Sequence, residues 1–309
     1  MMPICQSKLY GKAAIETLAA TYQQLYIAPG KGADEQYADI VKKGYEPENR
    51  DLSHFSTNEK DCLEYENTPV GMVLCITLHE RSDFVTFLRI MANRCSMAEI
   101  PDTQGASILD GVINWQKIRE HKKTFLEEAQ QNGVQLPDWN AEFRRFTSDR
   151  RNYKDALIVF SIGPYSAIPA SSLGLSNDEW ITLSHIIRKY HECTHFICRR
   201  NYPEKIEPVW DELVADAVGI YAAFGEYSSN TEKLFLGIEG ENYIGGRLEN
   251  YVTVENEEEK QETLQKLSSK ISKTLNHFDE IISENKGIAP FELTIKLEKT
   301  MDDLWIPSS

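Results

Sequence analysis

Residues 176–200 predict a single long helix whose start and end are both marked in the sequence. Ser176 followed three residues later by Glu179 is a capping-box pattern, in which each side chain satisfies a backbone N–H at the helix start. Arg199 and Arg200 fall in the last turn, where positive charge suits the helix dipole. The Asn-Tyr-Pro sequence that follows stops the helix. The segment therefore supports one helix of about six to seven turns.

This helix contains an HExxH pattern, His191-Glu192-Cys193-Thr194-His195. Residues four apart on a helix share a face, so the two imidazoles can reach one metal ion. Glu192 lies about 100° round the helix from His191, where its carboxylate can take a proton from a metal-bound water. Cys193 lies between the two ligand turns and is expected to face the core. The helical context favours a metal site over a solvated polar face.

The next predicted helix, from Pro208 to Gly225, offers a third ligand. Glu212 and Asp216 lie four residues apart on one face of it. Their neighbours are mostly apolar, so the helix is expected to be buried, and buried carboxylates need a partner or a metal. Glu212 can bind the ion, and Asp216 can accept a hydrogen bond from a ligating histidine, which fixes its tautomer. Asp211 is expected to matter far less for metal binding than Glu212.

HECTH followed by ELVAD resembles the gluzincin zinc metallopeptidases, the thermolysin-like clan. Members carry HExxH on one helix and E-x-x-A/S-D on the next, and the resemblance covers these two helices, about a sixth of the chain. It implies that His191, His195 and Glu212 bind Zn²⁺. It also implies Glu192 as the general base and Asp216 as the partner of a ligating histidine.

The same resemblance suggests how a substrate would be held. In that clan a strand before the active helix binds the substrate backbone, and residues 155–162 with the turn at 165–172 occupy the matching place, although an ordinary sheet strand is an equal alternative. Members also need a donor for the oxyanion of the tetrahedral intermediate. Tyr243 and Arg247, in a Gly-rich run, are the candidates. His277, the only histidine after the motif, is expected to be structural.

The chain is acidic, with 33 Lys+Arg against 48 Asp+Glu and a net charge of −15. This excludes a main role in gripping nucleic acid or an anionic membrane, because both demand a basic face. Most of the excess lies after residue 200, where Glu212 and Asp216 are the acids assigned to a cation. No run is long and apolar enough to span a membrane, and no secretory signal is visible. The six cysteines form no CxxC pair, which favours reduced thiols and a cytoplasmic location.

The overall pattern predicts an α+β protein that is mostly helical, with a zincin-like catalytic core and a small sheet beside the active-site helix. Three regions are expected: residues 1–150, a mixed α/β region that forms one wall of the cleft; residues 151–250, the catalytic core; and residues 251–309, the C-terminal helices. Buried strands are predicted at residues 70–78 and 155–162, and further helices at 13–26, 83–94, 107–131, 258–284 and 290–304.

Two other functions stay open at this point. Glu192 to His195 also reads as ExxH, which di-iron four-helix bundles use in pairs, and the nearest second copy is Asp51 to His54 in a polar region. A zincin-like fold could instead serve as a binding or regulatory module, for which the C-terminal helices would suit a partner protein. The intact Glu192 argues against an inactive module. The sequence therefore predicts zinc-dependent hydrolysis of a peptide bond in a peptide or protein substrate.

Overall fold

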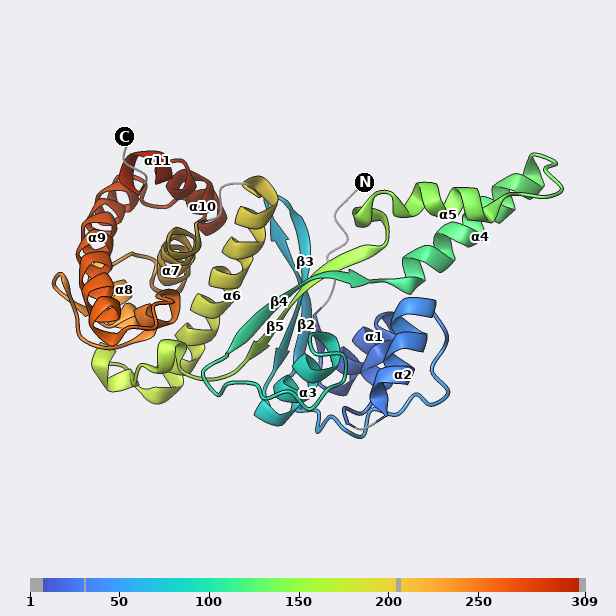
Figure 1. The fold of residues 1–309 in the computed structure, drawn as a ribbon, viewed down its shortest axis with the longest axis horizontal. Coiled ribbons are helices and arrows are strands. Elements are labelled where there is room, and N and C mark those ends of the chain that lie inside the picture. Colours follow the sequence, from blue (N-terminus) through green and yellow to red (C-terminus); the bar gives the residue numbers. More distant parts are fainter. Residues whose placement is uncertain (1–7, 31, 204–206, 306–309) are drawn as a thin grey trace. The chain divides into compact units, whose positions relative to one another are not determined.

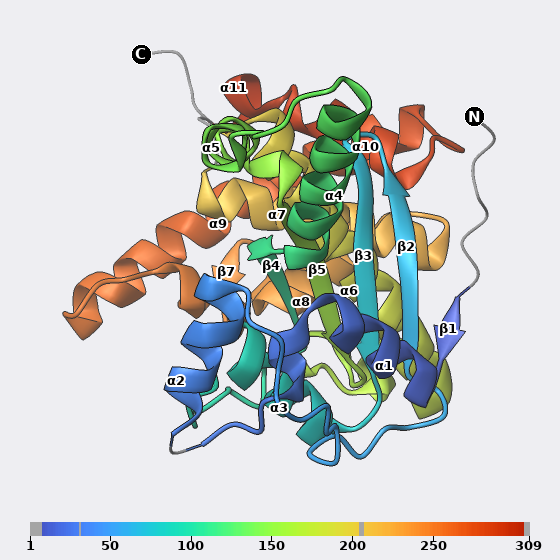
Figure 2. The same cartoon turned by 90° about the vertical axis from the view of Figure 1, so that its right-hand side faces the viewer.

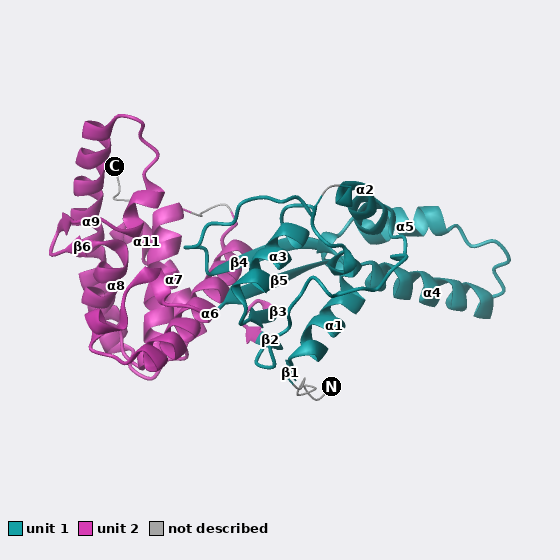
Figure 3. Cartoon of the chain, turned by 90° about the horizontal axis from the view of Figure 1, so that it is seen from below, with its two compact units in different colours: residues 1–66, 73–161 teal, residues 67–72, 162–309 magenta. Residues whose placement is uncertain are grey.

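The computed structural model describes residues 8–30, 32–203 and 207–305. Its fold is α+β and mostly helical, with a small mixed sheet, which confirms the expected fold class at that level. The chain divides into two compact units, unit 1 with residues 1–66 and 73–161, and unit 2 with residues 67–72 and 162–309 (Figure 3). In the described ranges, no helix is both long and apolar enough to cross a lipid bilayer.

The two units differ in their boundaries from the three regions expected from the sequence. Strand residues 154–161 belong to the sheet of unit 1 and not to a core at 151–250. The helices after residue 251 belong to unit 2, together with the helices that carry the predicted site, because their apolar residues share one core.

Unit 1 is built on a five-stranded sheet in the order β1-β2-β3-β5-β4. Strand β5 runs parallel to β3 on one side and antiparallel to β4 on the other. Because both of its edges are paired, β5 cannot take up a peptide by backbone hydrogen bonding. This corrects the substrate-binding role considered for residues 155–162, and β4 is the strand at the edge. The strands are β1 (Leu9–Tyr10), β2 (Cys62–Thr68), β3 (Gly71–Leu78), β4 (Ala106–Ile113) and β5 (Lys154–Ser161).

The helices of unit 1 share one apolar core with the sheet. Residues of α1 and α3 pack on the face of β5 that carries Leu157 and Val159 (Figure 2). In the helix predicted over residues 13–26, the apolar stripe that runs from Ile15 to Leu25 is buried. The α-helix itself ends at Thr21, and a 3₁₀ turn continues it. Helices α4 and α5 run side by side (Figure 1). The helical segments are α1 (Lys12–Thr21), η1 (Gln23–Tyr26), α2 (Ala33–Tyr37), η2 (Ala38–Lys42), α3 (Arg81–Met91), α4 (Trp115–Gln131), α5 (Trp139–Thr147) and η3 (Arg150–Asn152).

The prediction of a helix over residues 107–131 is wrong for about the first third of that range, because these residues form strand β4. Gly111 has a φ of 80° at a bulge in the pairing of β4 with β5, and an α-helix cannot pass through a left-handed residue. Asn114 then starts α4, because its side chain accepts a hydrogen bond from the backbone N–H of Lys117. The expected helix is therefore a strand and a shorter helix separated by a capping residue.

From residue 162 onward, the described part of unit 2 is helical apart from one short hairpin and loops, and residues 67–72 add the turn between β2 and β3. The capping box of Ser176 and Glu179 is present at the start of α6, and α7 ends at Gly225 in a left-handed conformation, both as predicted. The helix expected over residues 290–304 is interrupted, so that it forms α10 and α11. The segments are η4 (Tyr165–Ala167), η5 (Ala170–Leu173), α6 (Asn177–Asn201), α7 (Pro208–Phe224), α8 (Ser229–Leu236), β6 (Ile238–Glu239), β7 (Asn242–Tyr243), η6 (Arg247–Tyr251), α9 (Glu257–Glu284), α10 (Pro290–Glu298) and α11 (Met301–Leu304).

The apolar stripe of α9 faces the interior of unit 2. Leu264, Ile271, Leu275 and Phe278 are fully buried in a core that also contains seven residues of α7. The stripe that would have suited a partner protein is thus covered within the chain itself. Helix α7 is buried on nearly all sides, which a largely apolar helix requires.

Helices α6 and α7 are in close contact at Gly219. A Cβ atom added there would lie 2.8 Å from the carbonyl oxygen of Ile187 and 3.0 Å from its Cγ2. We expect Gly219→Ala to lower the free energy of unfolding by about 1–2 kcal/mol. Overpacking against Ile187 should destabilise the protein by more than the higher helix propensity of alanine stabilises it. Urea denaturation measures this change.

Gly163→Ala is the matched control for that substitution. An added Cβ atom at Gly163 meets nothing within 4 Å, so its stability should stay close to that of the natural chain. A Gly219→Ala protein as stable as the Gly163→Ala protein would contradict the close contact between α6 and α7.

Candidate metal centre

The two histidines of the HExxH pattern project from one face of α6. His191 and His195 are only 6% and 5% exposed. Their rings lie edge to face, with the centroids 4.6 Å apart, and their Nε2 atoms are 3.0 Å apart. The helical spacing thus brings both ring nitrogens to a common position.

Helix α7 places Glu212 beside both histidines. Its Oε2 lies 3.5 Å from Nε2 of His191, and its Oε1 lies 3.4 Å from Nε2 of His195. Nitrogen and oxygen ligands about 2.0–2.1 Å from a tetrahedral zinc ion would lie about 3.4 Å from one another. The measured separations are close to this value, so the three side chains fit zinc and leave one tetrahedral position for water.

Asp216 supports His191 from behind. Its Oδ1 lies 2.8 Å from Nδ1 of His191 and also accepts a hydrogen bond of 2.6 Å from the hydroxyl of Tyr165. Arg247 pairs with the other carboxylate oxygen and donates to the Tyr165 hydroxyl at 3.1 Å. A carboxylate held in this way keeps the proton on Nδ1, so that Nε2 presents its lone pair to a metal. Asp216 therefore lies where its predicted role requires.

Asp211 supports His195 in the same manner, which sequence reasoning missed. Its Oδ2 lies 2.7 Å from Nδ1 of His195. Each histidine thus has its own carboxylate partner, and Asp211 has a contact with the site that the sequence did not predict. That Asp211 matters less for metal binding than Glu212 stays a prediction. The signal in the sequence was an acid adjacent to Glu212 on a helix predicted to be buried.

Burial and charge set the protonation of the site when no metal is bound. Burial, followed by the positive charge of His195, lowers the pKa of His191 to about 4. Burial also lowers the pKa of His195, but hydrogen bonds to Asp211 and Glu212 outweigh it and raise the value to about 10. The same histidines hold the pKa of Glu212 well below its usual value against the effect of burial. The site thus favours a positive charge between the ring nitrogens and Glu212.

Glu192 and Tyr251 border this group of ligands. Glu192 is half-buried, and its negative charge favours the protonated forms of the His191 imidazole and the Tyr251 hydroxyl, although burial dominates and leaves the pKa of His191 below its usual value. Tyr251, at the end of η6, donates a hydrogen bond of 2.9 Å to Oε2 of Glu212. Sequence reasoning missed Tyr251, because no local pattern around it points to a site.

The two oxyanion donors proposed from the sequence have other partners. The hydroxyl of Tyr243 donates to the carbonyl of Gly246 at 3.1 Å and accepts from its N–H at 2.9 Å, so that it holds a tight turn. Arg247 reaches the centre, but its guanidinium is bound to Asp216 and Tyr165. Its position is that of a residue that orients Asp216.

The remaining sequence candidates lie outside this centre. Cys193 is fully buried, as its expected core-facing position requires. His277 is exposed on α9 and bonds the carbonyl of Lys273 through Nδ1. His54 belongs to unit 1 and bonds the carbonyl of Leu25, and residues 51–54 lie in a loop. They do not provide the second helical ExxH that a di-iron bundle needs.

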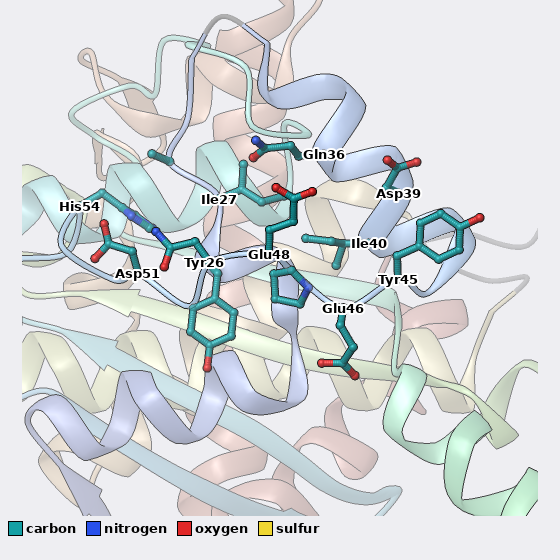
Figure 4. A pocket seen from close by; sticks show the side chains of 13 residues that line it. Tyr26, Ile27, Gln36, Asp39, Ile40, Tyr45, Glu46, Glu48, Asp51 and His54 are labelled. Atoms are coloured by element: carbon teal, nitrogen blue, oxygen red, sulfur yellow. The ribbon is translucent and has the colours of Figure 1, made fainter.

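Unit 1 contains a pocket of about 440 Å³ with an acidic lining (Figure 4). Most of its acids have partners within the chain. Asp39 pairs with Lys43, Glu46 pairs with Arg50, and Asp51 binds the N–H and hydroxyl of Ser53. In the described part of the chain, both groupings of side chains with metal-binding spacing lie in unit 2 and not here.

One protein-family model matches nearly the whole sequence. Residues 5–300 match the model of DUF7005, a family of unknown function. The chain belongs to this family. No curated protein and no solved structure gives a significant match. Because the function of DUF7005 is unknown, the function of this member has to be argued from its site.

Proposed function

We propose that this chain is a zinc-dependent hydrolase, and more specifically a metallopeptidase, with His191, His195 and Glu212 as the metal ligands. The observation that carries the proposal is the convergence of the two histidine Nε2 atoms, 3.0 Å apart, with the two carboxylate oxygens of Glu212, which lie 3.4 and 3.5 Å from them. The resemblance of HECTH and ELVAD to gluzincins supports it. On this proposal α6 and α7 form the centre of a zincin-like core.

The side chains around the ligands have the chemistry that hydrolysis needs. Zinc bound there would acidify a water molecule and polarise a carbonyl group. The carboxylate of Glu192 would take a proton from water and pass it to the leaving amine. The Tyr251 hydroxyl would donate a hydrogen bond to the oxyanion that develops on the carbonyl. Asp216 and Asp211 would hold the two imidazoles in the required tautomer. A peptide or protein substrate and a cytoplasmic location stay predictions.

Metal analysis combined with a peptide digest tests this function. Protein purified without added metal should contain at least one zinc per chain and should cleave members of a mixed peptide library. His191→Ala should lose one equivalent of zinc and the cleavage, whereas His277→Ala on the exposed side of α9 should keep both. Two irons per chain would overturn the proposal in favour of a di-iron oxidase. Bound zinc without cleavage of any peptide would favour a binding or regulatory module.

The role of the Tyr251 hydroxyl can be separated from metal binding. With the zinc site saturated, we expect Tyr251→Phe to lower kcat by about 10²–10³-fold, because one oxyanion donor is lost. Zinc affinity should fall by no more than the ~10–100-fold that loss of a hydrogen-bond partner of a ligand costs. Tyr243→Phe is the matched control and should change kcat little, since that hydroxyl holds the Gly246 turn. A large effect at Tyr243 together with a small one at Tyr251 would restore the assignment made from the sequence.

A further inference from the structure

We propose that Cys198, Asp211 and Glu298 form a second cation site, separate from the histidine centre and suited to zinc. The three side chains come from the last turns of α6, the first turn of α7 and the end of α10. Their ligating atoms, one thiol sulfur and two carboxylate oxygens, all lie within 4.8 Å of one another. This inference stands independently of the proposed hydrolase function.

The clearest sign of a missing ligand is the second oxygen of Asp211. Asp211 is 7% exposed, and its Oδ2 is bound to His195. Its Oδ1 is buried, and none of the described residues donates a hydrogen bond to it. A buried carboxylate oxygen without a partner is costly, and the Asp211 carboxylate lies in the group with Cys198 and Glu298. A cation bound by all three side chains would satisfy it.

Among the described residues, the cationic partner of this group is His195, which contacts only the Oδ2 atom of Asp211. Within the described ranges, no lysine or arginine forms an ion pair with Asp211 or Glu298. The hydrogen bond of 3.1 Å from Trp210 Nε1 to Glu298 is a neutral contact. Glu298 and the Oδ1 atom of Asp211 are thus without a cationic side-chain partner among the described residues.

The mixture of donors indicates which cation would bind. Thiolate ligands select zinc and other soft or borderline ions over magnesium and calcium, which prefer oxygen alone. Two carboxylates and one thiolate with water as the fourth ligand suit tetrahedral zinc. Cys198 is 2% exposed, whereas Glu298 is only half-buried, so an ion would enter past Glu298. Asp211 would then join the second site to His195.

Cobalt titration of the full chain tests the second site, because a thiolate ligand adds a strong charge-transfer band in the near ultraviolet that histidine and carboxylate ligands do not. The natural chain, stripped of metal, should bind two equivalents of Co²⁺ and develop this band. Cys198→Ser should lose the band and one equivalent, and Cys62→Ser, in unit 1, should keep both. His191→Ala should lose the other equivalent and retain the band, which separates this proposal from the histidine centre.

Several results would overturn the proposal. One is a natural chain that binds a single equivalent without the band, which would mean that Glu298 and Asp211 share a proton instead of a metal. Another is a band that survives in Cys198→Ser. Glu298→Gln keeps the thiol and a similar volume, and it should raise the Co²⁺ concentration needed for the band at least tenfold. An unchanged requirement would remove Glu298 from the site even if Cys198→Ser failed to fold.

Discussion

Glu192→Gln is expected to lower peptide hydrolysis by about 10²–10⁴-fold while the zinc content stays the same. Glutamine matches glutamate in size, but its amide cannot take a proton from water. Glu192 is not one of the three grouped ligands, so its loss leaves the metal in place. The measurement is kcat/KM on a peptide cleaved by the natural chain, together with metal analysis of the same sample.

Glu280→Gln is the control for this change, because Glu280 is exposed on α9. It should leave both hydrolysis and zinc content unchanged. If Glu192→Gln retained full turnover, Glu192 would not be the general base. If it lost zinc together with activity, Glu192 would act as a ligand, and the assignment of Glu212 would need revision.

Glu212→Gln is expected to weaken zinc binding at the histidine centre by more than the ~10–100-fold that loss of a hydrogen-bond partner of a ligand costs. Both oxygens of Glu212 face the histidine nitrogens, and the neutral amide is a poor replacement for the carboxylate. Competition with a zinc chelator of known affinity measures the change.

Glu226→Gln, at an exposed residue just after α7, is the matched control and should bind zinc as the natural chain does. The zinc affinity of Asp211→Asn should lie between those of Glu212→Gln and Glu226→Gln, since Asp211 would act on the ion only through His195. If Asp211→Asn lowered the zinc affinity more than Glu212→Gln, Asp211 and not Glu212 would be the third ligand.

The grouping of the candidate ligands could be predicted because their geometry is local. His191 and His195 lie four residues apart, and a capped helix fixes what that spacing means in space. Glu212 and Asp216 follow the same rule on α7, and only the pairing of the two helices had to be assumed. The spacing along each helix thus carried most of the assignment.

The surroundings of the ligands could not be predicted in this way. Tyr165 and Tyr251 reach the centre from 3₁₀ segments on either side of the two helices in sequence, and no periodicity marks them. The sequence predicts Arg247 as a hydrogen-bond donor to the oxyanion of the substrate, but its guanidinium forms an ion pair with Asp216. Contacts between distant segments decide such roles, and sequence spacing does not contain them.

The fold shows the same division. Strands β3 and β5 and helices α3, α7 and α9 were recognisable from apolar periodicity, because burial of one face leaves a regular pattern. Strand β4 was taken for the start of α4, since the left-handed Gly111 and the cap at Asn114 are single-residue signals within a long run. The sequence also could not show whether a strand lies at the edge of the sheet, because the order of the strands is set by the topology of the fold.

What the sequence by itself determined is the arrangement of the candidate site along two helices. Two histidines lie four residues apart on the first helix, with a glutamate next to the first of them, and two acids lie four residues apart on the second helix. Helical geometry is short-range, so these relations hold wherever the helices lie. The tertiary structure alone decided that Asp211 supports His195, that Tyr251 contacts Glu212, and that Cys198 meets Glu298. These pairs are joined by packing across the core of unit 2, and no rule of spacing along the chain encodes such contacts.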